Sequence, residues 1–221
     1  MTDNHQRHDI KSYVRRQRRL TRGQARALEL GWSEYCLSSA AGTLDLKAAF
    51  GRLASTVLEI GFGMGDSLAA QAKSSPEKNF IGVEVHKPGV GHLLMQVLEK
   101  ELTNLLVYNE DSRDVLSQAI PASSLQAVQI FFPDPWPKKR HHKRRLLGPG
   151  FLDLIAGKLK PGGLVHIATD WVPYAEAVEL LFASRSDFEL AETPQRPETK
   201  FERRGRSLGH EVLDLVYRLD Q

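Results

Sequence analysis

The chain has 221 residues, of which 41% are hydrophobic and 26% are charged, and these values exclude a disordered chain and favour one globular domain with a substantial core. No window reaches the roughly 18 to 20 apolar residues of a membrane-spanning helix, and Cys36 is the only cysteine, so no internal disulfide can form. The N-terminal stretch MTDNHQRHDIKSYVRRQRR lacks the apolar segment of a secretory signal, and a cytoplasmic location is therefore expected.

The net charge of +3 conceals an uneven distribution of charge along the chain. Residues 7–26, 138–145 and 200–206 carry net charges of +7, +6 and +3, so the rest of the chain is acidic. Clustered Lys and Arg residues are typical of a surface that binds a polyanion such as RNA. A set of merely solvated charged faces is the alternative interpretation.

Residues 1–50 are predicted to form a basic N-terminal arm and a small helical extension, and residues 51–221 to form the main domain. From about residue 55 onward, short apolar runs alternate with helical patterns. The expected strands are TVLEIG, NFIGVEV, NLLVYNED, LQAVQIFF and LVHIATD. Strands that alternate with helices at this spacing predict βαβ units and a parallel sheet.

Two further strand-like runs, DFELAE and HEVLDLVYRL, follow the last helical pattern with no helix between them. Without a crossover helix, two such strands are expected to pair antiparallel. The sequence therefore predicts an α/β fold with a doubly wound, mostly parallel sheet of seven strands that ends in an antiparallel hairpin.

A glycine loop follows the first expected strand, with Gly61, Gly63 and Gly65 in the spacing GxGxG. Glycines at the carboxyl edge of such a sheet permit a tight turn and close approach of a ligand to the backbone. Glu59 precedes this loop, and Asp66 falls where the next helix should start, which is the place that a pyrophosphate occupies in a dinucleotide site. These acids favour a cationic or zwitterionic ligand over a phosphate-bearing one.

Acids also end the next two expected strands. Glu84 lies 23 residues after Gly61, where an acid typically binds ribose hydroxyls, and Asp111 could accept from an adenine amine or support its own loop. S-adenosylmethionine fits this set, because it carries a sulfonium, an amine and a ribose but no phosphate. The alternative is that Asp66 is a helix N-cap and that Glu84 and Asp111 are solvated strand ends.

The fourth expected strand leads into Pro133-Asp134-Pro135-Trp136-Pro137. Three prolines restrict this turn and Trp136 offers a flat face, so the turn is interpreted as a platform for a base with Asp134 as acceptor; a purely structural rigid loop is the alternative. His141 and His142 have no Cys or acid at ligand spacing and are assigned to the basic run rather than to a metal site. The residues expected to hold RNA phosphates on either side are Lys138, Lys139, Arg140, Lys143, Arg144 and Arg145.

Two later segments carry further candidates for substrate contacts. Thr169-Asp170-Trp171 places an acid beside an aromatic residue at the same edge of the sheet. Residues 199–206, TKFERRGR, lie in the only long loop, and long loops in compact domains are usually functional or disordered. A solvated hairpin tip is the alternative for this second segment.

Together these segments resemble the bacterial tRNA (guanine-N7-)-methyltransferases. The motifs that carry the resemblance are VRRQRRLTRGQ, LEIGFGMGDSL, FIGVEVHKPGVGHLL, FFPDPWPKKRHHKRRL, ATDWVPYA and TKFERRG. The fourth of these is the most specific, and residues 31–53 show no such likeness. The resemblance implies the class I methyltransferase fold, S-adenosylmethionine as cofactor and methylation of N7 of guanine 46 in the variable loop of tRNA.

The same resemblance assigns roles to individual residues. It places Glu59, Glu84, Asp111 and Asp134 at cofactor positions and makes Asp134 the catalytic residue as well. It places Arg140, His141, His142, Lys143, Arg144 and Arg145 in the RNA-contacting run. The positions that match substrate-binding residues are Lys138, Asp170, Thr199, Lys200, Phe201 and Glu202.

Two other functions share part of this pattern. A nicotinamide-dependent dehydrogenase would use the same type of sheet, but the acids around the glycine loop argue against it. A non-catalytic RNA-binding protein would account for the basic runs but not for the series of acids at the strand ends. The expected partner is tRNA, with no membrane, no metal and no obligate protein partner.

Overall fold

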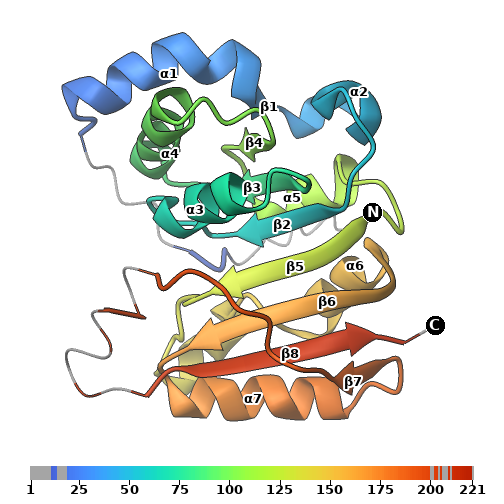
Figure 1. Cartoon of the computed structure of the whole chain (residues 1–221). Helices are drawn as coiled ribbons and strands as arrows, with labels where there is room; N and C mark the ends of the chain where they lie inside the picture. Colours follow the sequence, from blue (N-terminus) through green and yellow to red (C-terminus); the bar gives the residue numbers. More distant parts are fainter. Residues whose placement is uncertain are drawn as a thin grey trace, which may run out of the picture.

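The computed structural model describes residues 11–13, 19–199, 202–203, 205, 209 and 211–220 (Figure 1). Its first half contains α1 (Arg22–Tyr35), β1 (Cys36–Leu37), the 3₁₀ helix η1 (Ser39–Ala41), α2 (Leu46–Phe50), β2 (Thr56–Ile60), α3 (Asp66–Ser74), β3 (Asn79–Val83), α4 (Lys87–Glu99) and β4 (Leu105–Tyr108). Its second half contains α5 (Ser112–Gln118), β5 (Leu125–Phe131), the 3₁₀ helix η2 (Lys139–Arg144), α6 (Pro149–Ala156), β6 (Leu159–Thr169), α7 (Val172–Ala183), β7 (Phe188–Leu190) and β8 (Leu213–Leu219).

The described strands form one sheet in the order β1-β4-β3-β2-β5-β6-β8-β7. Neighbours from β1 to β6 pair parallel, whereas β8 pairs antiparallel with both β6 and β7. The predicted fold class and the antiparallel end of the sheet are confirmed. The strand count differs from the predicted seven, because Cys36 and Leu37 add a short strand beside Val107 and Tyr108 of β4.

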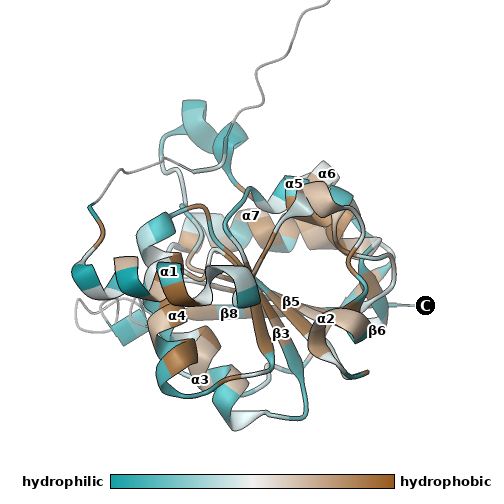
Figure 2. Ribbon diagram, turned by 90° about the horizontal axis from the view of Figure 1, so that it is seen from above, coloured by the Kyte–Doolittle hydropathy of each residue, from teal (hydrophilic) through white to brown (hydrophobic). Residues whose placement is uncertain are grey.

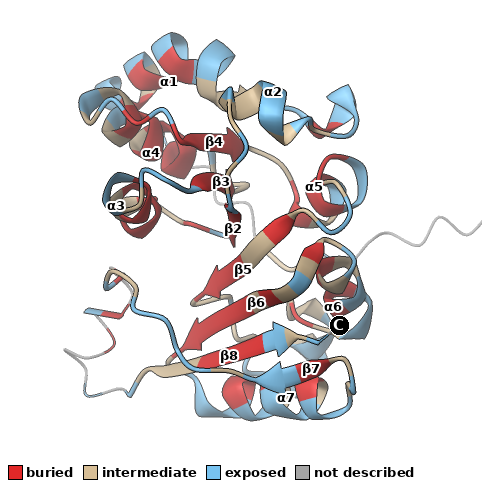
Figure 3. Cartoon of the chain, turned by 45° about the vertical axis from the view of Figure 1, so that its right-hand side comes forward, coloured by how far each residue is buried: buried red, intermediate tan, exposed pale blue. Residues whose placement is uncertain are grey.

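Helices cover both faces of the sheet, which explains why its central strands are buried and mostly apolar (Figures 2 and 3). All five residues of β2 and all five of β3 are buried. One core cluster joins the sheet to α5, α6 and α7, and includes Leu116, Phe151 and Phe182. The other joins it to α1, α3 and α4, and includes Leu28, Leu68 and Leu93.

Helix α1 packs on α4 and carries the chain to the edge of the sheet. It begins with a capping box, in which the side chain of Thr21 accepts from the backbone of Gln24 and the side chain of Gln24 accepts from the backbone of Thr21. After β1, the backbone N–H and hydroxyl of Ser39 donate to the carboxylate of Glu110, which follows β4. Residues 31–53 thus close the outer edge of the sheet, and a domain boundary near residue 50 remains a prediction.

The order of the strands fixes where a ligand site is expected. The chain proceeds outward from β2 to β3 and β4 and then returns to β5 on the other side of β2. This reversal between β2 and β5 is a topological switch point, and ligands of such sheets bind beyond the carboxyl ends of the strands at that point. The glycine loop follows β2 and the PDPWP turn follows β5, so the two motifs flank this crevice.

Candidate active site

The glycine loop needs glycine for its backbone geometry. Gly61, Gly63 and Gly65 have φ angles of 75°, 61° and 79°, which lie in the left-handed region that residues with a Cβ seldom adopt. The N–H of Gly61 donates to the carbonyl of Val83 at 2.8 Å, which joins the loop to the end of β3. A Cβ at Gly61 would meet no atom within 4 Å, so the space above this turn is open.

Glu84 joins the end of β3 to the glycine loop. Its carboxylate accepts from the backbone N–H of Gly63 at 2.9 Å and from that of His86 at 2.8 Å. Burial raises the pKa of this carboxyl, the backbone hydrogen bonds oppose the rise, and the charge of Asp134 adds to it. Glu84 therefore joins the glycine loop to the start of α4, and Asp134, at the end of β5, is close enough for its charge to act on this carboxyl.

Gly89 brings the start of α4 against the same loop. A Cβ at this position would stand 2.0 Å from the carbonyl oxygen of Gly63 and 3.1 Å from its carbonyl carbon, which are backbone atoms. Gly89 was not among the site residues predicted from the sequence. The stretch KPGVG offered a signal, since its proline marks the start of the helix after β3, and that start lies at the carboxyl edge of the sheet.

Asp66 and Asp111 both stand at helix starts, although neither matches the alternative of an N-cap at Asp66 and a solvated strand end at Asp111. The N-cap of α3 is Gly65, and Asp66 is its first residue, whose carboxylate accepts from Gln96 of α4 at 2.8 Å. Asp111 is the N-cap of α5, since its carboxylate accepts from the N–H of Arg113 at 3.0 Å. Asp111 is buried rather than solvated. One of its carboxylate oxygens caps α5, and the other accepts from Lys11.

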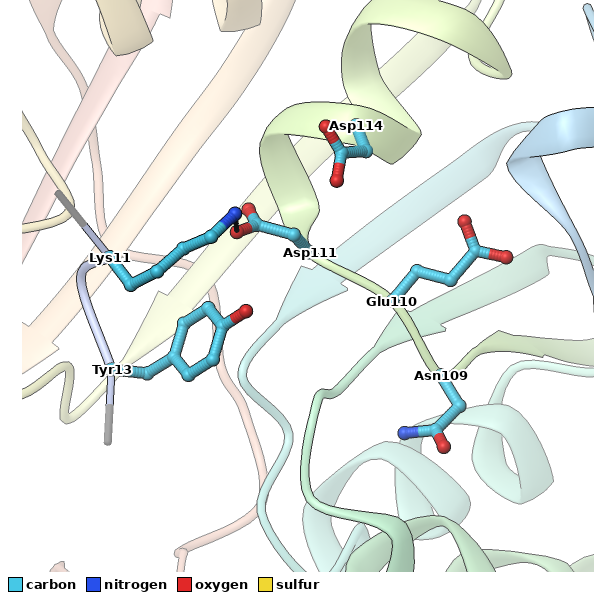
Figure 4. A pocket seen from close by; sticks show the side chains of 6 residues that line it. All are labelled: Lys11, Tyr13, Asn109, Glu110, Asp111 and Asp114. Atoms are coloured by element: carbon cyan, nitrogen blue, oxygen red, sulfur yellow. Dashed lines mark hydrogen bonds and ion pairs between the residues drawn. The ribbon is translucent and has the colours of Figure 1, made fainter. Parts of the chain in front are cut away.

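Asp111 borders a cleft of about 530 Å³ beside the ends of β3 and β4 (Figure 4). The amine of Lys11 donates to its second oxygen at 2.9 Å, so the N-terminal arm reaches over this cleft. Asn109 donates to the carbonyl of Glu84 at 2.7 Å and fixes the two strand ends to each other. The lining residues are Lys11, Tyr13, Asn109, Glu110, Asp111 and Asp114.

Glu59 lies beneath the crevice rather than on its surface. Its side chain is 3% exposed, and its carboxylate accepts from Gln71 at 3.3 Å, while Gln71 in turn accepts from Gln129 at 2.8 Å. Burial raises the pKa of Glu59 to about 8, although the positive charge of Arg196 opposes the rise.

Glu59→Gln is expected to weaken the pH dependence of stability. The folded chain holds the Glu59 proton up to about pH 8, whereas the unfolded chain releases it near pH 4.5, so the stability that it contributes is complete below pH 4.5 and is lost as the pH rises through 8. Between pH 6 and pH 9 the thermal midpoint of the wild type should fall by on the order of 5 °C more than that of the variant. Melting curves followed by circular dichroism measure these midpoints. If the midpoint changes with pH equally in the wild type and the variant, the pKa of Glu59 is not raised in the folded protein.

The turn after β5 is strained on both sides of Asp134. Phe132 and Trp136 have φ angles of 51° and 45°, which are unfavourable for bulky side chains and are typical of functional sites. The N–H of Phe132 donates to the carbonyl of Ala168 at 2.8 Å, and the indole N–H of Trp136 donates to the carbonyl of Ser12 at 3.0 Å. Asp134 itself is exposed, at the tip of a turn that its neighbours fix.

The basic run after this turn forms the short helix η2. The ring of His141 stands edge-on to Trp136, with 5.7 Å between the ring centroids, and is only half-exposed. The members that are exposed to solvent are Lys138, Lys139, Arg140, His142 and Lys143.

Arg144 and Arg145 turn back onto the protein instead. The guanidinium of Arg144 lies 4.9 Å from the ring centroid of Trp136, and that of Arg145 lies 5.1 Å from the ring centroid of Tyr174. Arg145 also donates to the carbonyl of Pro135 at 3.0 Å. These two arginines therefore support the turn, which the uniform pattern of charge in the sequence did not reveal.

The later candidates converge on the same edge of the sheet. Asp170 follows β6 and is half-buried. Thr199 and Glu202 are buried, and the hydroxyl of Thr199 accepts from the N–H of Glu202 at 3.0 Å. Lys200 and Phe201 lie outside the described residues, so their place as substrate contacts stays a prediction.

Arg196, which was not predicted as a site residue from the sequence, is bonded to this Glu202. It donates to Asp214 at 2.9 and 3.0 Å and to Glu202 at 2.6 Å. Asp214 is also paired with His166 at 2.6 Å. These partners are too far apart along the chain for any local pattern to indicate the contact.

Within the described part of the chain, no helix combines the length and the apolar character needed to cross a membrane. Among those same residues, no group of three or more His, Cys, Asp or Glu side chains is arranged to hold a metal ion.

Comparison with solved structures bears on the fold. The 16S rRNA methyltransferase KamB is similar with a TM-score of 0.58 and 19% identity, over 81% of this chain and 95% of that chain. The 16S rRNA (adenine(1408)-N(1))-methyltransferase of Catenulisporales acidiphilia, in a structure with its cosubstrate SAM, is similar with a TM-score of 0.57 and 16% identity, over 84% of this chain and 92% of that chain. The sheet is thus the one found in known methyltransferases.

Comparison with sequences bears on the family. The family described as "Putative methyltransferase" matches residues 54–215. The tRNA (guanine-N(7)-)-methyltransferase of Alkalilimnicola ehrlichii is 53% identical over 218 residues, which cover 95% of this chain and 92% of the relative. The protein of the same name from Nitrosococcus oceani is 49% identical, over 95% of this chain and 90% of the relative. With about half of its residues shared with these relatives over nearly its whole length, the chain belongs to the family of tRNA (guanine-N(7)-)-methyltransferases.

Proposed function

We propose that the protein transfers a methyl group from S-adenosylmethionine to N7 of a guanine in tRNA, and that this guanine is residue 46 of the variable loop. The observation that carries the proposal is the meeting of two motifs at the switch point between β2 and β5. The glycine loop and Glu84 face the crevice from one side and the strained turn with Asp134 faces it from the other, directly before the basic run. The names of the relatives support tRNA and guanine N7 as the acceptor.

The residues of the crevice suit S-adenosylmethionine better than a dinucleotide. Glu84 and Asp111 stand at adjacent strand ends, where they can accept from ribose hydroxyls and from an adenine amine. Asp66 opens α3, so a carboxylate occupies the helix start that would otherwise attract a phosphate. Gly61 leaves open space above the loop, and Gly63 is bonded to Glu84, so these two glycines would lie beside the cofactor. Glu59 is buried beneath the loop and would support it from below.

Methyl transfer to guanine N7 requires alignment of the base with the methyl donor more than it requires removal of a proton. Guanine N7 has an in-plane lone pair and no proton, so no strong base is needed to make it a nucleophile. S-adenosylmethionine, when bound, supplies a methyl group on a cationic sulfur. The protein has to hold N7 in line with that methyl group and to stabilise the positive charge as it moves onto the base. Asp134 can do both, because its carboxylate accepts hydrogen bonds and stands at a fixed position beside the crevice.

The experiment is methyl transfer from labelled S-adenosylmethionine to unmodified tRNA, followed by nucleoside analysis and mapping of the label. The proposal expects 7-methylguanosine at position 46 and at no other site. Label at another position would overturn the assignment of the guanine. Binding of tRNA without transfer would indicate a non-catalytic RNA-binding protein, and tight binding of NAD in place of S-adenosylmethionine would indicate a dehydrogenase.

Gly89→Ala is expected to weaken S-adenosylmethionine binding at least about tenfold, since the added methyl group would displace the carbonyl of Gly63 and with it the glycine loop. Gly91→Ala is the matched control on the same helix, because a Cβ there would press on Gln24 of α1 at 3.0 to 3.1 Å instead. Calorimetric titration should give the control an affinity within about threefold of the wild type. Equal losses in both variants would mean that α4 packing, and not the loop, sets the affinity.

A further inference from the structure

Arg196 lies in the segment between β7 and β8, and its positive charge neutralises two carboxylates, those of Asp214 and Glu202. Its side chain is 7% exposed. One edge of the guanidinium donates to both oxygens of Asp214, and the remaining nitrogen, Nη1, donates to Glu202. Such a forked geometry is specific to arginine, since its donors are fixed in one plane.

Asp214 fixes one end of this arrangement to the sheet. It lies on β8 and is bonded to Nε2 of His166 on β6, which is 1% exposed. Although burial favours the neutral carboxyl, the hydrogen bonds from His166 and Arg196 outweigh it and lower the pKa of Asp214 to about 2. Arg196 is therefore attached to strands β6 and β8 of the sheet through a charged acid.

The face of the Arg196 guanidinium lies on the strand that carries the turn. It stands 4.9 Å from the ring centroid of Phe131, the last residue of β5. The ring of Phe131 is also edge-on to His166, with 5.0 Å between the centroids. Phe131 directly precedes the strained Phe132 and is three residues before Asp134, so Arg196 packs against the base of the turn.

The other end of the arrangement consists of Thr199 and Glu202. The hydroxyl of Thr199 accepts from the N–H of Glu202, and its carbonyl accepts from the N–H of Arg203 at 3.1 Å. Glu202 is 4% exposed and is bonded to Arg196. The guanidinium of Arg196 thus joins Glu202 to Asp214 on β8.

We propose that Arg196 is a positioning residue, which holds Thr199 and Glu202 and the base of the Asp134 turn in one fixed arrangement at the carboxyl edge of the sheet. The inference rests on the proposed function, because it takes both segments as parts of the site that receives the guanine. Arg196 acts through Glu202 and Phe131 and does not itself take part in the chemistry.

Arg196→Lys is the first test, since lysine keeps the charge but cannot bind Asp214 through two nitrogens and Glu202 through a third. Arg185→Lys is a matched control. Arg185 also forks between two acids, Asp153 and Asp187, and its guanidinium lies 5.7 Å from the ring centroid of Phe188, but these partners belong to α6, β7 and the turn before it. A second variant, Arg196→Gln with Asp214→Asn, removes both charges of the pair and so avoids an uncompensated buried acid at Asp214.

Methyl transfer to tRNA is measured for each variant together with its thermal midpoint. We expect kcat to fall at least about tenfold in Arg196→Lys and in the double variant, with KM for S-adenosylmethionine within about threefold of the wild type, while Arg185→Lys keeps kcat within about twofold. A kcat within tenfold of the wild type in Arg196→Lys, or an equal loss in Arg185→Lys, would overturn the proposal.

Hydrogen exchange of the amides of Glu202 and Arg203, which donate to Thr199, gives a readout that does not depend on the reaction. We expect faster exchange there in Arg196→Lys than in the wild type or in Arg185→Lys, and equal exchange in all three would overturn the positioning role. If neither the wild type nor Arg185→Lys transfers a methyl group, the proposed function is wrong. The exchange measurement alone then tests whether Arg196 positions Glu202.

Discussion

Asp134→Ala is expected to lower kcat for tRNA methylation at least about 100-fold, which corresponds to about 2.7 kcal/mol in the activation barrier, while tRNA affinity changes little. The reason is that Asp134 is a single exposed acid on a turn fixed by Phe132 and Trp136, where it can orient the base and stabilise developing positive charge. Affinity for tRNA should instead depend on the basic residues that follow. Single-turnover kinetics and a filter-binding titration separate the two effects.

Asp134→Asn divides the contribution of Asp134 into two parts. Asparagine keeps a carbonyl acceptor but removes the negative charge, so a kcat close to the wild type would assign Asp134 to orientation, and a loss as large as that of alanine would assign it to charge stabilisation. Turnover of the alanine variant within about tenfold of the wild type, a difference of only ~1.4 kcal/mol, would refute the catalytic role altogether.

Removing two exposed lysines of the basic run is expected to flatten the salt dependence of tRNA binding. In Lys138→Ala with Lys143→Ala, two phosphate contacts should be lost, so the slope of log affinity against log salt concentration should decrease by about 1.5. Arg144 and Arg145 are left in place because they pack on Trp136 and Tyr174, and their loss would disturb the turn as well as the charge.

The matched control is Lys73→Ala with Lys78→Ala, which removes the same charge from two exposed lysines. Lys73 lies in the last turn of α3 and Lys78 directly precedes β3, so both stand at the amino edge of the sheet, opposite the site. This variant should keep the slope of the wild type. Equal slopes in the two double variants would place the RNA on another surface.

Most of the fold could be predicted because the central strands are buried on both faces. Runs such as NFIGVEV are mostly apolar, and their alternation with helical patterns leaves few other arrangements. The hairpin of β7 and β8 followed from the missing crossover helix. The short strand Cys36–Leu37 could not be predicted, because two residues carry no period and their pairing depends on β4, about 70 residues later.

The candidate site was predicted where its residues follow strands and was missed where it depends on tertiary contacts. Glu84 and Asp134 could be placed at one edge because parallel strands end together. Arg196 could not, since its partners are fixed by the antiparallel position of Asp214 opposite Ala168 on β6. The role of Arg145 could not be predicted either. In the sequence it is one of several adjacent basic residues, whereas in the structure it donates to the carbonyl of Pro135.

The most direct test of the whole account uses tRNA in which the acceptor guanine is replaced by 7-deazaguanine, which keeps the shape and the Watson–Crick edge of the base but has C–H in place of N7. If the site aligns the N7 lone pair with the methyl donor, this tRNA should bind with unchanged affinity and accept no labelled methyl group. Transfer of label to the 7-deazaguanine tRNA at the rate seen with unmodified tRNA would contradict methylation at N7 and with it the role proposed for Asp134.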